Sequence, residues 1–210
     1  MKAAIFDLDG TLLDSMRMWA DLNRAFLAQH HLELPPDIWR KTEHLSFYEN
    51  AQYYAHAFPE LHMTGDEIFE IWQQAVMDAY IHDVQPKPGA VDYLHRLHQQ
   101  GVPMAVATLT DRAHAEAALR THNLLQYFAF ILTVEECGVS KRQPDIYLQC
   151  ASRLGAAPAD TCVFEDSLYA ATTAHAAGFP VIGIFDPVSS VSREALSACC
   201  VRVADDFTQL

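Results

Sequence analysis

Two aspartates, Asp7 and Asp9, follow directly after an apolar run at residues 3–6 and are separated by one leucine. Carboxylates are depleted inside strands, so a pair of them at the end of one indicates a functional need. Residues two apart on an extended chain point the same way, and two carboxylates that close repel each other unless a cation lies between them. The spacing therefore predicts a cation site.

Other polar residues follow later apolar runs in the same manner. Glu165 and Asp166 end the run that begins at residue 161, Thr108 ends the run 102–108, and Lys141 stands in a loop before a helix opened by a proline. Ligands of an open parallel sheet bind at the carboxyl ends of its strands, so these side chains are expected to meet at one edge. A site built of oxygens without His or Cys favours Mg²⁺ over Zn²⁺.

The loops beside these carboxylates contain features that suit a phosphate group. Gly10 follows the aspartates, and a glycine lets backbone N–H groups approach an anion closely. The segment "TLTD" at 108–111 offers a hydroxyl and N–H groups at a helix N-terminus. The predicted phosphate-binding residues are Gly10, Thr108, Leu109, Thr110 and Lys141.

The composition limits the classes of partner. The chain has 210 residues, 50% of them apolar, and a formal net charge of -13. Such an acidic chain is a poor candidate for binding nucleic acid or an anionic membrane surface. The five cysteines include no C-x-x-C pair and are expected to be reduced thiols of a cytoplasmic protein. No apolar run approaches a membrane span, and the short lead into the first strand leaves no room for a signal peptide.

The alternation of short apolar runs with helical patterns predicts the fold class. Strands are expected at 3–6, 102–108, 128–133, 161–166, 180–185 and 201–203. Strands that alternate with helices, without hairpin signals, indicate an α/β fold with a Rossmann-like, doubly wound parallel sheet covered on both faces.

The stretch between the first strand and the rest of the sheet is expected to be a separate helical unit. It is nearly all helical in pattern and far longer than a crossover needs. We therefore expect an inserted α-helical cap at 14–87 on a catalytic core formed by 1–13 and 88–210. Hinges are expected near 12–15 and 84–88, where the second carries two prolines.

Four segments in this order resemble the motifs of the haloacid dehalogenase superfamily. They are "DLDGT" at 7–11, Thr108 after an apolar strand, "KRQPD" at 141–145 and "EDS" at 165–167. The motifs and the elements between them cover essentially the whole chain. The insert between the first two resembles the α-helical cap of the subgroup that contains β-phosphoglucomutase and phosphoglycolate phosphatase.

The resemblance implies a role for each catalytic residue. Asp7 would be the nucleophile that attacks phosphorus to give an aspartyl phosphate. Asp9 would protonate the leaving oxygen and then activate water, and an acid at this position is missing from the dehalogenase and phosphonatase branches. Thr108 and Lys141 would neutralise and orient the transferred phosphoryl group.

The resemblance also implies a magnesium site. Mg²⁺ would be held by Asp7, the backbone carbonyl of Asp9 and Asp166. Glu165 would be either a further ligand or a residue behind the ligands. The implied activity is magnesium-dependent hydrolysis of a small phosphorylated metabolite, such as a sugar phosphate, by a chain that we expect to be a monomer.

Two alternatives stay open. A sugar phosphomutase of the same fold would carry an Arg-x-Asp-Ser-Leu-like stretch in its cap, where this chain has "KTEHLSFYEN" at 41–50. The other alternative is a regulatory protein that binds a phosphorylated ligand without turnover.

Some residues of the insert are candidates for contact with substrate. Helical spacing puts Met16, Trp19 and Asn23 just past the catalytic loop, whereas Arg40, Lys41 and His44 are weaker candidates. The pairs His30–His31 and His95–His98 lack further partners at ligand spacing, so they are expected on solvated faces.

Overall fold

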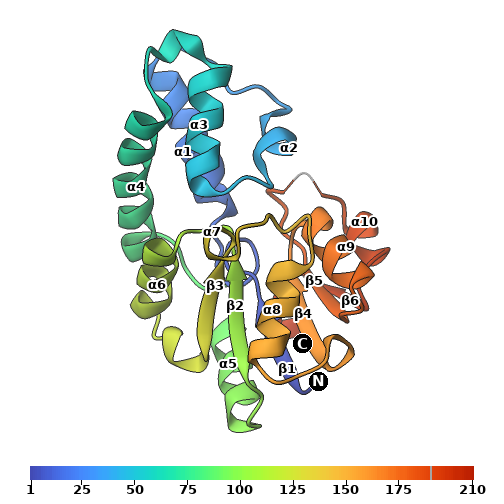
Figure 1. The fold of residues 1–210 in the computed structure, drawn as a ribbon. Helices are drawn as coiled ribbons and strands as arrows, with labels where there is room; N and C mark the ends of the chain where they lie inside the picture. The colour runs from blue at the N-terminus through green and yellow to red at the C-terminus, as the bar shows by residue number, and fades with distance from the viewer. Residues whose placement is uncertain (190) are drawn as a thin grey trace.

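The computed structural model describes residues 1–189 and 191–210, and its centre is a sheet of six parallel strands (Figure 1). The strands are β1 (Ala3–Phe6), β2 (Met104–Thr108), β3 (Phe130–Thr133), β4 (Thr161–Glu165), β5 (Val181–Ile184) and β6 (Arg202–Ala204). Their order across the sheet is β3-β2-β1-β4-β5-β6. This confirms the predicted α/β fold with a doubly wound parallel sheet.

Helices cover both faces of the sheet because its strands are apolar on both sides. Successive side chains alternate between the faces, so Ala4 and Phe6 of β1 belong to one hydrophobic core and Ile5 to the other. The first core is completed by α5 (Ala90–Gln99) and α6 (Arg112–Thr121), and the second by α8 (Asp145–Arg153), α9 (Leu168–Ala176) and α10 (Arg193–Ser197). Within the described residues, no helix is long and apolar enough to cross a membrane.

A helical insert follows β1 and lies over the end of the sheet to which the strands point (Figure 1). It consists of α1 (Met16–Gln29), α2 (Ile38–Thr42), α3 (Phe47–Ala57) and α4 (Gly65–His82). Thr64 and Glu67 form a capping box at the start of α4, and Ser46 and Glu49 form another at α3. The short α2 was not anticipated, because its five residues are too few to show a period.

Two linkers, residues 12–14 and 85–87, join the helical insert to the rest of the chain. They run side by side: the Asp14 N–H donates to Gln85 O and the Lys87 N–H donates to Leu12 O, each at 2.8 Å. The Lys87 ammonium is buried and lies 2.7 Å from Asp186 Oδ2, just past β5. The predicted hinge segments are therefore hydrogen-bonded to each other, and one of them is fixed to the sheet by a buried ion pair.

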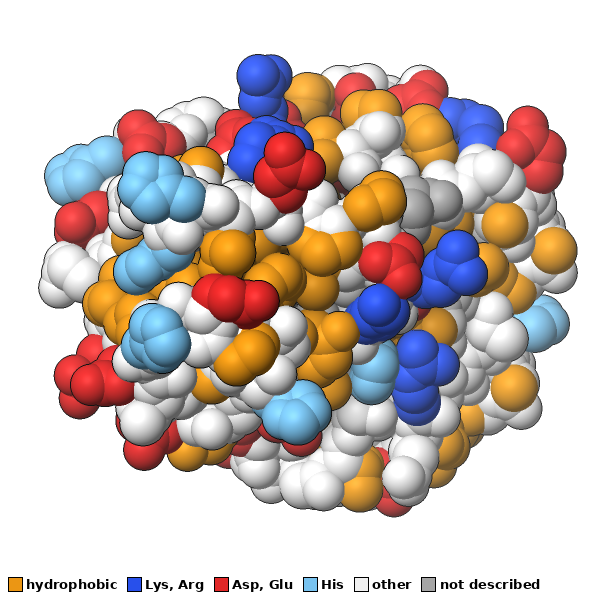
Figure 2. Space-filling view, turned by 90° about the horizontal axis from the view of Figure 1, so that it is seen from above, with side chains coloured by type: hydrophobic (Ala, Val, Ile, Leu, Met, Phe, Trp, Pro, Cys, Tyr) orange, Lys and Arg blue, Asp and Glu red, His pale blue; other side chains and the backbone are white. Residues whose placement is uncertain are grey.

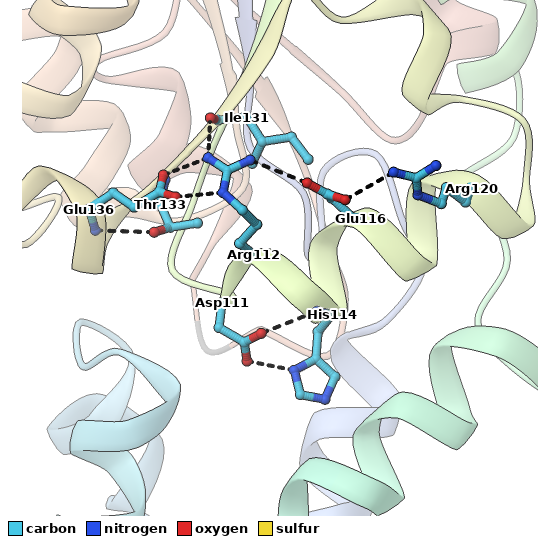
Figure 3. A network of polar contacts seen from close by, with 8 residues as sticks. All are labelled: Asp111, Arg112, His114, Glu116, Arg120, Ile131, Thr133 and Glu136. Carbon is cyan, nitrogen blue, oxygen red and sulfur yellow. Dashed lines mark hydrogen bonds and ion pairs between the residues drawn. The ribbon is translucent and has the colours of Figure 1, made fainter.

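His114 connects the helical insert to α6 on the core. Figure 3 shows its ring turned toward Asp111, which caps α6, and Nδ1 lies 2.5 Å from Asp111 Oδ2. Its Nε2 lies 2.9 Å from the Gln73 carbonyl of α4. Both partners can only accept hydrogen bonds, so the doubly protonated imidazolium is the form that satisfies both. Burial alone would lower the pKa of His114, but these two acceptors outweigh burial and the pKa is raised.

The raised pKa of His114 predicts a pH dependence of stability. A group with a higher pKa in the folded state than in the unfolded state stabilises the fold fully below its unfolded pKa, here about 6.5. That contribution is lost as the pH rises through the folded pKa. In urea unfolding of the wild type and of His114→Leu, the difference in unfolding free energy should be largest near pH 6 and shrink at higher pH. A difference that stays constant with pH would contradict a charged His114.

Candidate active site

The sheet has its topological switch point between β1 and β4, and the candidate site lies at the carboxyl ends of these two strands. β1 ends at Phe6, where the Asp7 N–H donates to Phe164 O of β4 at 3.0 Å. The chain then turns tightly, because the N–H groups of Leu12 and Leu13 both donate to Leu8 O. The segment 7–9 is therefore not extended strand, and its two carboxylates take separate directions.

Gly10 has a different role from the predicted one. Its N–H donates to Leu13 O at 2.9 Å, so this N–H is not free for an anion. The residue has φ +80°, and a Cβ at this position would lie 2.4 Å from Asp166 Oδ2. Glycine is needed here because the turn has positive φ and because Asp166 approaches the backbone closely.

Three carboxylates, those of Asp7, Glu165 and Asp166, form a buried acidic cluster. One oxygen from each carboxylate lies within 4.8 Å of the corresponding oxygens of the other two. The Lys141 ammonium lies 2.5 Å from Asp7 Oδ1 and 2.6 Å from Glu165 Oε1. The Tyr147 hydroxyl donates to the same Glu165 oxygen at 2.7 Å. The structure thus brings together residues from three of the four sequence motifs.

The charges within this acidic cluster do not balance. Burial raises the pKa of Asp7 to about 7 in spite of Lys141, and burial with the neighbouring Asp7 and Glu165 raises the pKa of Asp166 well above its ordinary range. Oε2 of Glu165 is buried and has no hydrogen-bond partner among the described residues. One ammonium cannot neutralise three carboxylates, and the available donors are all oxygens. The cluster therefore fits a hard divalent cation.

The Asp9 carboxylate is not part of the acidic cluster, whereas the spacing had suggested that it shares a cation with the Asp7 carboxylate. Hydroxyl groups surround it instead. Ser15 and Tyr80 each donate to Oδ1 at 2.6 Å, and Thr110 donates to Oδ2 at 2.5 Å. The reason is the tight turn after β1, which directs this side chain toward the helical insert.

The loop after β2 is also arranged differently from the prediction. The Thr110 N–H donates to Thr108 Oγ1 at 3.0 Å and the Thr110 hydroxyl donates to Asp9, so neither group is free for a phosphate. Asp111 accepts from the His114 N–H and thereby caps the helix end that was expected to seat the phosphate. Thr108 and Leu109 line the cavity above the cluster together with Lys141. The Thr108 hydroxyl hydrogen remains available to a ligand.

A cavity that is open to solvent lies between this site and the helical insert. Asp7, Asp9 and Asp166 lie at its core side. The predicted contacts Met16, Trp19 and Asn23 do line it, whereas Arg40, Lys41 and His44 do not. Further wall residues from the insert are Trp39, Thr42, Glu43, Leu45, Phe47 and Asn50.

The histidines form no second metal site in the part of the chain that the structure describes, where the acidic cluster is the only group of potential metal ligands. Viewed from above the insert, histidine side chains are scattered over the surface (Figure 2). His30, His31, His95 and His98 are exposed, as expected.

Sequence reasoning missed Ser15, Tyr80 and Tyr147. Ser15 is six residues beyond Asp9, and a hydroxyl at a turn could have suggested it. Tyr80 is 71 residues away from Asp9, and Tyr147 is 18 residues before Glu165. Their roles depend on how the helices pack against one another, and a local sequence pattern does not predict that packing.

Known proteins resemble the chain over most of its length. A family model for haloacid dehalogenase-like hydrolase matches residues 1–178. Validoxylamine A 7'-phosphate phosphatase of Streptomyces hygroscopicus subsp. limoneus is 29% identical, covering 97% of this chain and 93% of the relative. Fructose-1-phosphate phosphatase YqaB of Escherichia coli (strain K12) is 28% identical, covering 86% of this chain and 94% of the relative.

A solved structure from Thermotoga maritima, provisionally named a β-phosphoglucomutase, has a TM-score of 0.76 and 23% identity. The match covers 97% of this chain and 94% of that protein, and it shows that the two chains share one fold. The chain belongs to the haloacid dehalogenase-like hydrolase family.

Proposed function

We propose that the protein is a Mg²⁺-dependent phosphatase that hydrolyses a small phosphorylated metabolite through an aspartyl phosphate on Asp7. One observation carries the proposal. Asp7 and Asp9 are two residues apart, yet Asp7 pairs with the Lys141 ammonium inside the acidic cluster and Asp9 is surrounded by hydroxyls. Two carboxylates in two environments can take two chemical roles.

Asp7 is suited to nucleophilic attack. Lys141 donates to its Oδ1, and the Asp7 side chain lines the cavity. Attack on phosphorus forms the bond to this carboxylate and breaks the bond to the leaving oxygen. Lys141 and the Thr108 hydroxyl line the same space and can bind the phosphoryl oxygens.

The acidic cluster is the proposed magnesium site. Asp7 and Asp166 would be ligands with the backbone carbonyl of Asp9, and the unpartnered oxygen of Glu165 makes it a further candidate. When bound, the ion supplies positive charge that offsets the cluster and the phosphate.

Asp9 is suited to proton transfer in both halves of the reaction. It gives a proton to the leaving oxygen, then takes one from the water that attacks phosphorus and releases phosphate. Its partners Ser15, Tyr80 and Thr110 all use hydroxyl groups. A hydroxyl can donate to a carboxylate and accept from a carboxylic acid, whereas an ammonium can only donate. The surroundings of Asp9 therefore serve both of its protonation states.

The cavity walls support an uncharged polyol as the leaving group. Trp19 and Phe47 offer aromatic faces, while Asn23 and Asn50 offer amides, and Asn50 Oδ1 is buried with no hydrogen-bond partner among the described residues. Among those residues, Lys141 is the only Lys or Arg that lines the cavity. A second anionic group on the substrate would have no cation to meet. The names of two relatives, which act on fructose 1-phosphate and validoxylamine A 7'-phosphate, agree with a sugar-like substrate.

Residues 14–87 are proposed to act as a cap that closes over the core and limits water in the site. The cytoplasmic location, the monomeric state and the lack of nucleic-acid or membrane partners stay predictions.

The test measures phosphate release from a panel of phosphate esters, either with about 2 mM MgCl₂ or with excess EDTA to remove the metal. The panel contains fructose 1-phosphate, glucose 6-phosphate, glycerol 1-phosphate, phosphoglycolate, fructose 1,6-bisphosphate and p-nitrophenyl phosphate. We expect release from the uncharged polyol phosphates, and loss of at least about 100-fold with EDTA. EDTA-resistant turnover would contradict the magnesium site.

The same panel separates the two alternatives. Sugar isomers formed without free phosphate, from β-glucose 1-phosphate with a bisphosphate activator, would indicate a mutase. No turnover of any phosphoester would indicate a binding protein.

A further inference from the structure

Tyr80 provides a contact between the helical insert and the proposed proton-transfer residue. It lies in the last turns of α4, and its hydroxyl donates to Asp9 Oδ1 at 2.6 Å. The side chain is 0% exposed. Of the three hydroxyls on Asp9, this is the one carried by α4, whereas Ser15 precedes α1 and Thr110 follows β2.

The packing around Tyr80 holds the hydroxyl in this place. The Tyr80 ring packs edge-to-face against Trp19, with ring centroids 6.4 Å apart. The centroid of the His114 ring, on α6, lies 6.3 Å from that of Tyr80. A carboxylate oxygen can only accept, so the phenol is the hydrogen-bond donor in this contact.

We propose that Tyr80 is a positioning residue for Asp9, so that the helical insert itself sets the direction of the carboxyl group that protonates the leaving oxygen. This inference rests on the proposed function. Oδ1 of Asp9 accepts from Ser15 and Tyr80, and Oδ2 accepts from Thr110. Removal of the Tyr80 hydroxyl leaves one donor on each oxygen and so holds the carboxyl group less firmly in its present direction. Proton transfer depends on such alignment.

The leaving group determines how much this alignment matters. An alkoxide is strongly basic and needs a proton as the bond to phosphorus breaks. A p-nitrophenolate leaves without one, so its departure depends little on the acid. The ratio of kcat/KM for an alkyl phosphate to that for p-nitrophenyl phosphate therefore reports the acid step, because kcat/KM covers the steps up to the aspartyl phosphate.

The test compares Tyr80→Phe with the control Tyr54→Phe. Tyr54 is also a fully buried tyrosine of the insert, but its hydroxyl has no hydrogen-bond partner among the described residues. For Tyr80→Phe, kcat/KM should fall by about 10-fold to 100-fold on the best alkyl phosphate of the panel and stay within about twofold on p-nitrophenyl phosphate. Tyr54→Phe should leave both values unchanged. In an Asp9→Asn background, Tyr80→Phe should have no further effect on the alkyl phosphate.

The outcomes are distinct. Equal loss on both substrates would assign Tyr80 a merely structural role and overturn the inference, as would an additive effect in the Asp9→Asn background. The aryl phosphate serves as the internal reference for the amount of folded enzyme. A wild type that hydrolyses neither substrate would refute the proposed function itself.

Discussion

Replacement of Asp7 by asparagine is expected to lower phosphate release by at least about 10⁴-fold, because an amide cannot form the proposed acyl phosphate. The fold should persist. The amide keeps the shape of the side chain, and Lys141 keeps its second partner, Glu165. The loss of one buried carboxylate also reduces the repulsion that raises the pKa of Asp166. The measurement is kcat on the best substrate of the panel, together with thermal unfolding of both proteins.

Asp92→Asn is the matched control, since Asp92 is an exposed aspartate on α5, distant from the cavity. It should retain wild-type kcat. If Asp7→Asn kept more than about one hundredth of the activity, Asp7 would not be the nucleophile.

Replacement of Lys141 by methionine is expected to impair both stability and turnover. Lys141 is 1% exposed and joins Asp7 to Glu165, so its loss leaves two buried carboxylates without their ammonium. Breaking a buried ion pair by removal of one partner costs about 3 to 5 kcal/mol of unfolding free energy. The phosphoryl group also loses a charged contact, for which we expect a fall in kcat of about 100-fold to 1,000-fold. Urea unfolding in EDTA and phosphate release with Mg²⁺ measure the two effects.

A second substitution separates the effect on stability from the effect on turnover. In the double variant Lys141→Met/Glu165→Gln, one of the two uncompensated charges is gone, so part of the unfolding free energy should return while kcat stays low. Wild-type stability of Lys141→Met would show that the ammonium does not balance the acidic cluster.

The sequence predicted the convergence of the motifs for a general reason. Strand ends in a parallel sheet meet at one edge, so Asp7, Lys141 and Asp166 could be brought together without coordinates. The structure differs from the prediction in local hydrogen bonds. Gly10 and Thr110 were expected to offer N–H groups to phosphate, but the turns that contain them use those N–H groups internally. Residue type alone does not predict which backbone N–H groups form hydrogen bonds within a turn.

The partners of Asp9 could not be predicted for a different reason. Tyr80 reaches Asp9 only because α4 packs against α6, and His114 binds the Gln73 carbonyl across the same contact. These contacts depend on the placement of the whole insert. Periodicity indicated the longer helices of the insert, but it contains no information about which helix faces the catalytic loop.

The paired linkers constrain how the helical insert can travel. Because residues 12–14 and 85–87 are hydrogen-bonded to each other, they form a single short ribbon instead of two independent tethers. In the proposed closure both segments of this ribbon would have to bend together, because the Lys87–Asp186 ion pair holds its base beside β5. On such a ribbon, the proposed movement of the insert would be a rotation about one axis, with little twisting or sliding. Each closure would return Tyr80 along the same arc to the same carboxylate.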